Sequence, residues 1–171
     1  MMGERTISLN LRQLAGLAVI MLTMLLVAPL RAHAQDAGSK TILFVCQHGV
    51  VNSQMAAAYF NKIAKERGLP FTAISRGIDG RYRSVPVRIE DGLALDGLSP
   101  ANAPRELTAG EAGRARRVLA FDEIPADLRG RASVTYWSGI PLGINDYEVT
   151  RDEIVRRIDV LMPTLTDAPA K

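Results

Sequence analysis

The chain has 171 residues, and its 21 Lys and Arg residues against 18 Asp and Glu residues leave a net charge of only +3. Because the arginines are interleaved with acidic residues, the sequence lacks the basic stretch typical of proteins that bind nucleic acid. The single cysteine excludes an internal disulfide, and the length is enough for one domain rather than two.

The N-terminal segment has the pattern of an export signal. A polar start with Arg5 and Arg12 precedes an uncharged stretch, residues 14–30, and then Ala32-His33-Ala34. We expect residues 1–34 to be a signal peptide that is cleaved after Ala34, which predicts a periplasmic or secreted protein. If the segment is not cleaved it would anchor the protein, and this is the only membrane association we expect. Residues 35–40 form a leader, and residues 41–165 the predicted domain.

The first strand and helix flank the cysteine. Residues 41–45 are β-branched and aromatic and predict a strand that ends just before Cys46. Apolar residues then recur at helical spacing from residue 55 to the stop signal Gly68-Leu69-Pro70, with Asn52 or Ser53 as the expected N-cap.

Strands and helices continue to alternate along the chain. Strands are expected over 71–75, 117–121 and 133–137, and helices over 86–95, 108–115 and 149–162. Since the strands lack a clean two-residue alternation, the pattern predicts a parallel sheet covered by helices on both faces. Ligands bind such sheets at the carboxyl ends of the strands, so the loop that begins at Cys46 is the expected site.

Residues 46–55 read Cys-Gln-His-Gly-Val-Val-Asn-Ser-Gln-Met. This segment resembles the Cys-x5-Arg-Ser phosphate-binding loop of the low-molecular-weight protein tyrosine phosphatases and the related arsenate reductases. The likeness extends to Ser75-Arg76-Gly77, Leu107-Thr108, residues 118–122, Trp137 and the C-terminal helix. The resemblance implies an α/β fold of three layers, α/β/α, with a four-stranded parallel sheet of order 2-1-3-4, flavodoxin-like and doubly wound.

The resemblance also implies roles for the loop residues. Cys46 would attack phosphorus or arsenic, and Ser53 would stabilise its thiolate. The oxyanion would be held by the backbone of Gln47, His48, Gly49, Val50, Val51 and Asn52. The physical chemistry agrees, because amides converging at a helix N-terminus favour a negative charge.

The chain departs from the family pattern at two positions. Asn52 stands where the family has the arginine that clamps the oxyanion, and an amide offers no charge in its place. Ile140 precedes Pro141 where the family has the aspartate that protonates the leaving oxygen. Asp146 is the nearest carboxylate in that loop and is our candidate general acid, with capping of the last helix as the alternative.

A positive charge could reach the loop from elsewhere. Arg76, Arg81 and Arg83 follow the second strand, which neighbours the first in this fold, so one of their guanidinium groups could swing over the loop from outside it. His48 would also add a positive charge when protonated; alternatively its side chain faces solvent.

We expect an exported phosphatase that hydrolyses phosphomonoesters through a cysteinyl-phosphate, with phosphate, an arsenate-like oxyanion or a phosphoprotein as its ligand. The alternatives are an impaired protein that binds an oxyanion or a partner, and an arsenate reductase-like or thiol redox protein. With one cysteine, either redox function would depend on an external thiol. No cofactor is expected, and no metal site, because the predicted domain lacks a spaced set of ligands.

Overall fold

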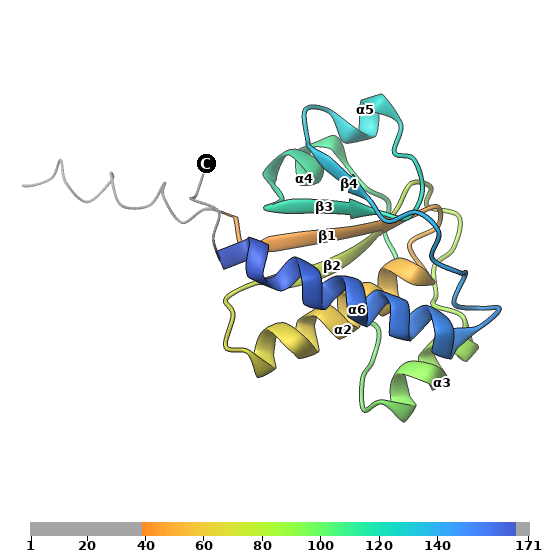
Figure 1. Ribbon diagram of the computed structural model, residues 1–171. Coiled ribbons are helices and arrows are strands. Elements are labelled where there is room, and N and C mark those ends of the chain that lie inside the picture. The colour runs from red at the N-terminus through yellow and green to blue at the C-terminus, as the bar shows by residue number, and fades with distance from the viewer. Residues whose placement is uncertain (1–38, 167–171) are drawn as a thin grey trace, which may run out of the picture. The chain divides into compact units, whose positions relative to one another are not determined.

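The computed structural model describes residues 39–166, so the predicted signal peptide and most of the leader lie outside the described residues. Figure 1 shows strands and helices alternating along this part of the chain. In chain order they are β1 (Thr41–Cys46), α2 (Asn52–Glu66), β2 (Thr72–Gly77), α3 (Val87–Leu95), α4 (Ala109–Arg114), β3 (Arg117–Ala120), α5 (Ala126–Arg129), β4 (Val134–Tyr136) and α6 (Tyr147–Thr166). Of these elements, only the short α5 was not predicted from the sequence.

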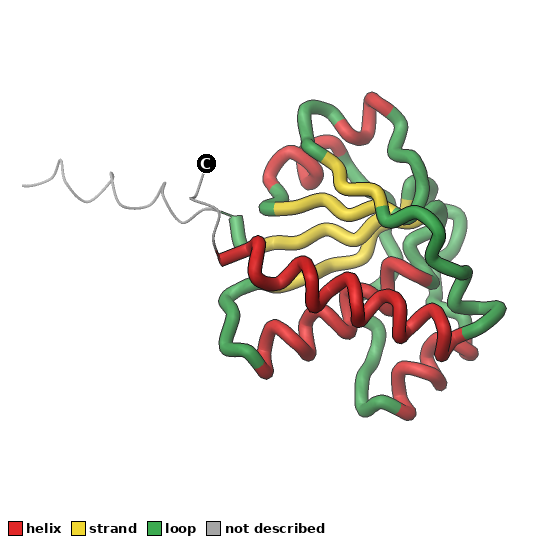
Figure 2. Tube along the Cα trace, in the orientation of Figure 1, coloured by secondary structure: helices red, strands yellow, loops and turns green. Residues whose placement is uncertain are grey.

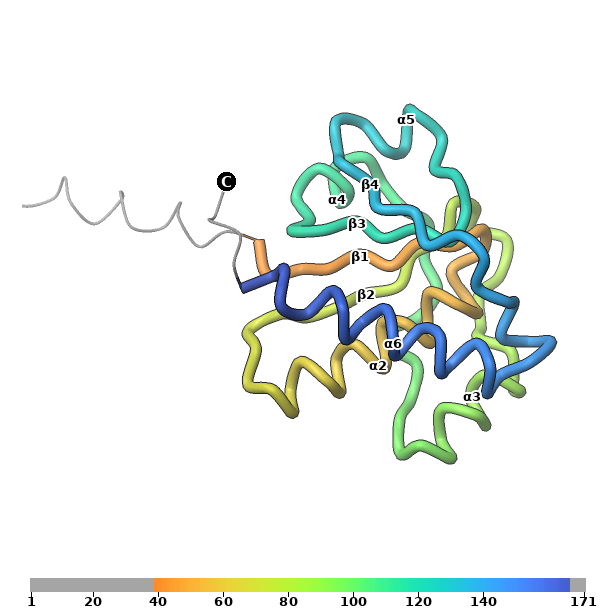
Figure 3. The backbone as a smooth tube through the Cα atoms, in the orientation of Figure 1, coloured from red at the N-terminus to blue at the C-terminus, as the bar shows by residue number. Residues whose placement is uncertain are grey.

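The four strands form one parallel sheet of order β2-β1-β3-β4, which confirms the predicted fold class. In Figure 2 the strands lie between helices. Val45 of β1 is paired with Arg76 of β2 on one side and with Ala120 of β3 on the other. Since all strands run the same way, the loops that follow β1, β2 and β3 gather at one end of the sheet (Figure 3).

The two faces of the sheet are covered by different helices. Helices α2, α3 and α6 cover one face, where the fully buried Phe44 packs against Phe60 and Trp137 at centroid distances of 5.9 and 5.4 Å. Leu43 and Val45 point to the other face, toward α4 and α5. This alternation follows from the two-residue period of a strand. In residues 39–166 no helix is both long and apolar enough to cross a bilayer.

The outer edge of β2 is closed by side-chain amides. Asn61 of α2 pairs with the backbone of Ala73, its Oδ1 accepting from the N–H at 2.7 Å and its Nδ2 donating to the carbonyl at 3.0 Å. Asn102 pairs with the backbone of Ser75 in the same way, at 2.8 and 3.2 Å. Gly77 then bonds to the backbone of residues 105 and 107. Every second residue of β2 therefore has its outward N–H and C=O satisfied.

Candidate active site

The loop after β1 turns tightly against the end of β2. Gly49 has a φ of +69°, and a Cβ placed on it would lie 2.5 Å from the backbone nitrogen of Gly77. A side chain is excluded there both by the left-handed backbone and by the close approach of the two segments. The glycine at position 49 thus allows the chain to reverse between Cys46 and the start of α2.

The Cys46 thiol is at the end of a chain of hydroxyl groups. Its Sγ lies 2.9 Å from Ser53 Oγ, to which Ser75 Oγ donates a hydrogen bond of 2.8 Å. Cys46 is 7 % exposed, and both serines are fully buried. The structure thus places Cys46 and Ser53 together, and it adds Ser75, to which the sequence analysis gave no role.

The carbonyl groups of the loop are bonded to the surrounding protein. The carbonyls of Cys46 and Gln47 accept from the backbone N–H groups of Ile78 and Asp79, at 3.1 and 3.0 Å. The carbonyl of Gly49 accepts from the buried Gln54 side chain at 3.3 Å, and it lies 3.1 Å from Ser75 Oγ, whose single proton goes either to this carbonyl or to Ser53 Oγ. Carbonyls 46, 47 and 49 are engaged in this way, which leaves the N–H groups of the loop as the backbone groups suited to an oxyanion.

One loop amide has a carboxylate partner from β3. The N–H of Gln47 donates to Asp122 Oδ2 at 2.8 Å, because β3 pairs with β1 and residue 122 leaves the sheet beside Cys46. This contact puts one negative charge at the rim of the loop. Asp122 is another site residue that the sequence analysis missed.

Asn52 neither caps α2 nor faces the loop interior. Its Nδ2 donates to the carbonyl of Pro141 and its Oδ1 accepts from the N–H of Gly143, both at 2.9 Å. The predicted N-cap role of Asn52 and Ser53 is wrong: helix α2 has no side-chain cap, since the side chain of Asn52 holds residues 141–143 and that of Ser53 contacts the thiol. Asn52 is 4 % exposed, so this bridge is buried.

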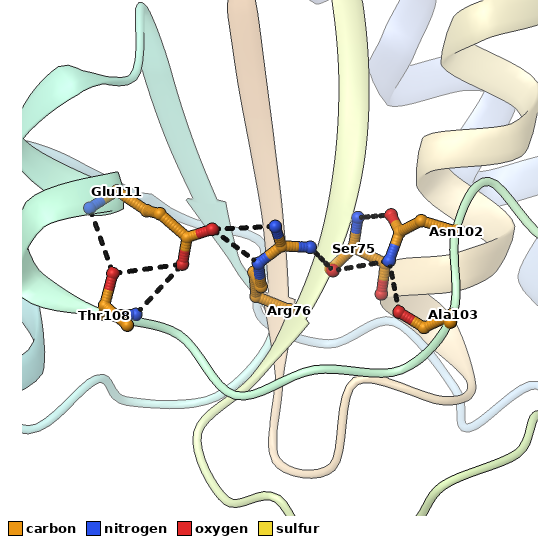
Figure 4. Close-up of polar contacts among 6 residues, drawn as sticks. All are labelled: Ser75, Arg76, Asn102, Ala103, Thr108 and Glu111. Atoms are coloured by element: carbon orange, nitrogen blue, oxygen red, sulfur yellow. Dashed lines mark hydrogen bonds and ion pairs between the residues drawn. The ribbon is translucent and has the colours of Figure 1, made fainter.

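The structure gives Asp146 and Arg76 partners outside the loop. Asp146 Oδ1 accepts from the N–H of Val149 at 3.1 Å, so Asp146 caps α6, which was the alternative reading of this residue. Arg76 is 6 % exposed and its guanidinium binds Glu111 of α4, with Nη2 at 2.7 Å from Oε1 (Figure 4). Arg81 and Arg83 are exposed on the loop after β2. Asp146 thus has the contact of a helix cap, and Arg76 is held in an ion pair with Glu111.

His48 is held by a carboxylate that the sequence analysis did not single out. Its Nδ1 lies 2.8 Å from Asp79 Oδ1, and Gln47 Nε2 donates to Asp79 Oδ2 at 3.1 Å. The hydrogen bonds from these two partners lower the pKa of Asp79 to about 2, and the bond with His48 has the larger effect. Asp79 is therefore a carboxylate at neutral pH. The ring of Tyr82 packs edge-on against His48 with 4.9 Å between centroids. The His48 side chain is 31 % exposed, which leaves it open to solvent at the loop.

No protein-family model and no curated protein matches the chain. Solved structures of similar fold do. A low-molecular-weight protein tyrosine phosphatase from Bacillus subtilis is 25 % identical with a TM-score of 0.61, over 74 % of this chain and 97 % of that one. The arginine phosphatase YwlE, in a mutant with a phosphorylated active-site serine, is 24 % identical with a TM-score of 0.66, over 74 % and 96 %.

A more distant match lies outside bacteria. A protein tyrosine phosphatase from Entamoeba histolytica, with Hepes in its active site, is 15 % identical with a TM-score of 0.67, over 75 % of this chain and 98 % of that one. These likenesses cover nearly the whole of each similar protein, so the described domain spans the full fold.

Proposed function

We propose that this chain, which has the fold of the low-molecular-weight protein tyrosine phosphatases, hydrolyses phosphomonoesters through a cysteinyl-phosphate intermediate on Cys46. The observation that supports this most directly is the Ser75–Ser53–Cys46 hydrogen-bond chain, which ends on the thiol beside the loop amides. Thiolate attack on phosphorus forms the S–P bond and expels the alcohol oxygen. Water then attacks phosphorus, which releases phosphate and returns the electron pair to sulfur.

We expect the turnover to be slow. A guanidinium clamp on a transferring phosphoryl group commonly contributes several kcal/mol to transition-state stabilisation. At position 52 the side chain is a neutral amide turned toward Pro141 and Gly143. Export by residues 1–34, with action outside the cytoplasm, is part of the same proposal and rests on the sequence pattern alone.

The test is hydrolysis of an activated aryl phosphate by the wild type beside Cys46→Ser and Asn52→Arg variants. Turnover that Cys46→Ser abolishes, with phosphate trapped on Cys46 and detected by mass spectrometry, would support the proposal. If Asn52→Arg increases this turnover, the missing charge limits the rate. Equal turnover by wild type and Cys46→Ser would refute the proposal.

A second function is favoured by the Asn52 bridge. A loop that keeps its amides but commits residue 52 to the backbone of 141–143 fits a protein that binds an oxyanion without turning it over. Saturable binding of inorganic phosphate, measured by calorimetry, together with no Cys46-dependent hydrolysis, would identify this case. Phosphate binding and hydrolysis that are both absent would exclude both functions.

A further inference from the structure

The leaving oxygen in the proposed reaction needs a proton. The carboxylates of Asp146, Asp122 and Asp79 each already accept a hydrogen bond from another group of the protein. Asp146 caps α6, and Ile140 precedes Pro141 in the segment held by Asn52. Asp122 accepts the N–H of Gln47, and Asp79 is kept ionised by His48 and Gln47. A side chain that carries a proton at neutral pH must therefore be sought among other residue types.

His48 and Asp79 have the arrangement of an oriented imidazole. Strand register brings them together: Cys46 pairs with Gly77, so His48 and Asp79 each lie two residues beyond the paired strand ends. Asp79 is fixed in turn by its own N–H, which donates to the Gln47 carbonyl at 3.0 Å. A carboxylate bonded to one ring nitrogen sets the tautomer and orientation of the ring and stabilises the imidazolium.

Nε2 of His48 is the ring nitrogen available to transfer a proton. With Nδ1 bonded to Asp79, Nε2 is the remaining site for a proton, on a side chain that is 31 % exposed. Tyr82 packs against the ring and restricts its rotation. Because His48 is the second residue after Cys46, its ring belongs to the loop that would surround the oxyanion.

We propose that His48 is the general acid of this site and that Asp79 is its positioning residue. The inference rests on the phosphatase activity proposed above. When sulfur attacks phosphorus and the P–O bond breaks, Nε2–H gives its proton to the departing oxygen. In the second step the neutral imidazole takes a proton from the attacking water, so that the imidazolium is restored.

The charges that face His48 define the expected pH dependence. Asp79 and the ring of Tyr82, both from the loop after β2, contact the His48 side chain, and Asp122 lies on the adjacent Gln47 amide. Loss of the Asp79 charge removes the counterion of the imidazolium. The alkaline fall in activity should therefore begin at lower pH in an Asp79→Asn variant, whose amide can still accept the hydrogen bond.

The experiment compares kcat/KM for phosphate esters whose leaving groups range from dinitrophenol to phenol. His48→Asn retains a donor near Asp79 but lacks Nε2, and we expect it to lose roughly 100-fold on phenyl phosphate and about tenfold or less on dinitrophenyl phosphate. Asp146→Asn is the matched control and should keep the wild-type dependence on the leaving group. An unchanged alkaline limb in Asp79→Asn would overturn the role of Asp79.

The remaining outcomes separate this inference from the proposed function. If His48→Asn and the wild type depend equally on the leaving group, His48 is not the acid, although Cys46-dependent hydrolysis stands. If Asp146→Asn steepens the dependence instead, Asp146 is the acid and the assignment to His48 is overturned. If the protein does not hydrolyse even dinitrophenyl phosphate in a Cys46-dependent way, the proposed phosphatase function is refuted, and so is the role of His48 as its general acid.

Discussion

Replacing Asn52 with alanine is expected to lower the free energy of unfolding by about 1–3 kcal/mol. The change removes the two 2.9 Å hydrogen bonds between the Asn52 amide and residues 141 and 143. The N–H of Gly143 is then left buried without its acceptor, at a cost of about 1–3 kcal/mol, and the bond to Pro141 is worth about 1 kcal/mol.

Two effects reduce this cost. The carbonyl of Pro141 keeps a second donor, because Thr150 Oγ1 lies 3.2 Å from it. Alanine also has the higher helix propensity at the first residue of α2, which returns at most about 0.7 kcal/mol. With these two effects included, the expected loss of unfolding free energy is the range of about 1–3 kcal/mol stated at the outset.

Urea unfolding followed by fluorescence measures this loss directly. Trp137 is the single tryptophan of the chain, and its buried ring lies against Phe44 and Phe121 in the core. Asn145→Ala is the matched control, since Asn145 is exposed in the same segment and should change stability by less than about 0.5 kcal/mol. If Asn52→Ala and Asn145→Ala have the same unfolding midpoint, the amide bridge does not hold residues 141–143.

Three further predictions concern the packing around the loop. Arg76→Met should cost about 3 kcal/mol in thermal or urea unfolding, because it leaves the Glu111 carboxylate without the guanidinium that binds it; an unchanged Tm would argue against this ion pair. Gly49→Ala should destabilise the protein by clearly more than Gly68→Ala: both have a positive φ, which costs about 1–2 kcal/mol, but only Gly49 also meets a neighbouring backbone, so equal losses would contradict the clash. Stability should decrease as the pH falls from about 4.5 toward 2, because the folded protein lowers the pKa values of Asp79, to about 2, and of Glu111 below those of the unfolded chain; Asp79→Asn should flatten this decrease in acid titrations followed by circular dichroism.

The sequence could predict the parts of the site that lie within one short segment. Cys46 and Ser53 are seven residues apart, on a strand end and the following helix, so a local pattern is enough to place them together. The fold class followed from alternating elements in the same way. The partners of Asn52 could not be predicted, because they lie 89 and 91 residues further along the chain, in an irregular segment.

Arg76 shows how a small error in a strand end changes a functional hypothesis. The sequence pattern predicts that the second strand ends at residue 75, and Arg76 would then be a loop residue free to swing toward Cys46. The strand in fact extends to Gly77, so Arg76 alternates with Ser75: Ser75 faces α2 and reaches Ser53, whereas Arg76 faces α4 and Glu111 (Figure 4). Because neighbouring residues of a strand point to opposite faces of the sheet, Ser75 reaches the site and Arg76 packs on the other face.

Asp79 could have been found with the correct register. Once the pairing of Cys46 with Gly77 is known, the residues that follow both strands must lie side by side. The sequence pattern fixes that register only weakly here, since the strands are buried on both faces and do not alternate.

The closed edge of β2 has a consequence for the behaviour of the protein among copies of itself. An open edge strand is a template on which a second chain can add a strand, and this is a common route to aggregation. At β2 the outward groups of Ala73, Ser75 and Gly77 are already bonded to Asn61, Asn102 and the 105–107 backbone. An incoming strand would first have to displace two bidentate amides and a backbone segment, so folded molecules resist polymerisation along this side of the sheet.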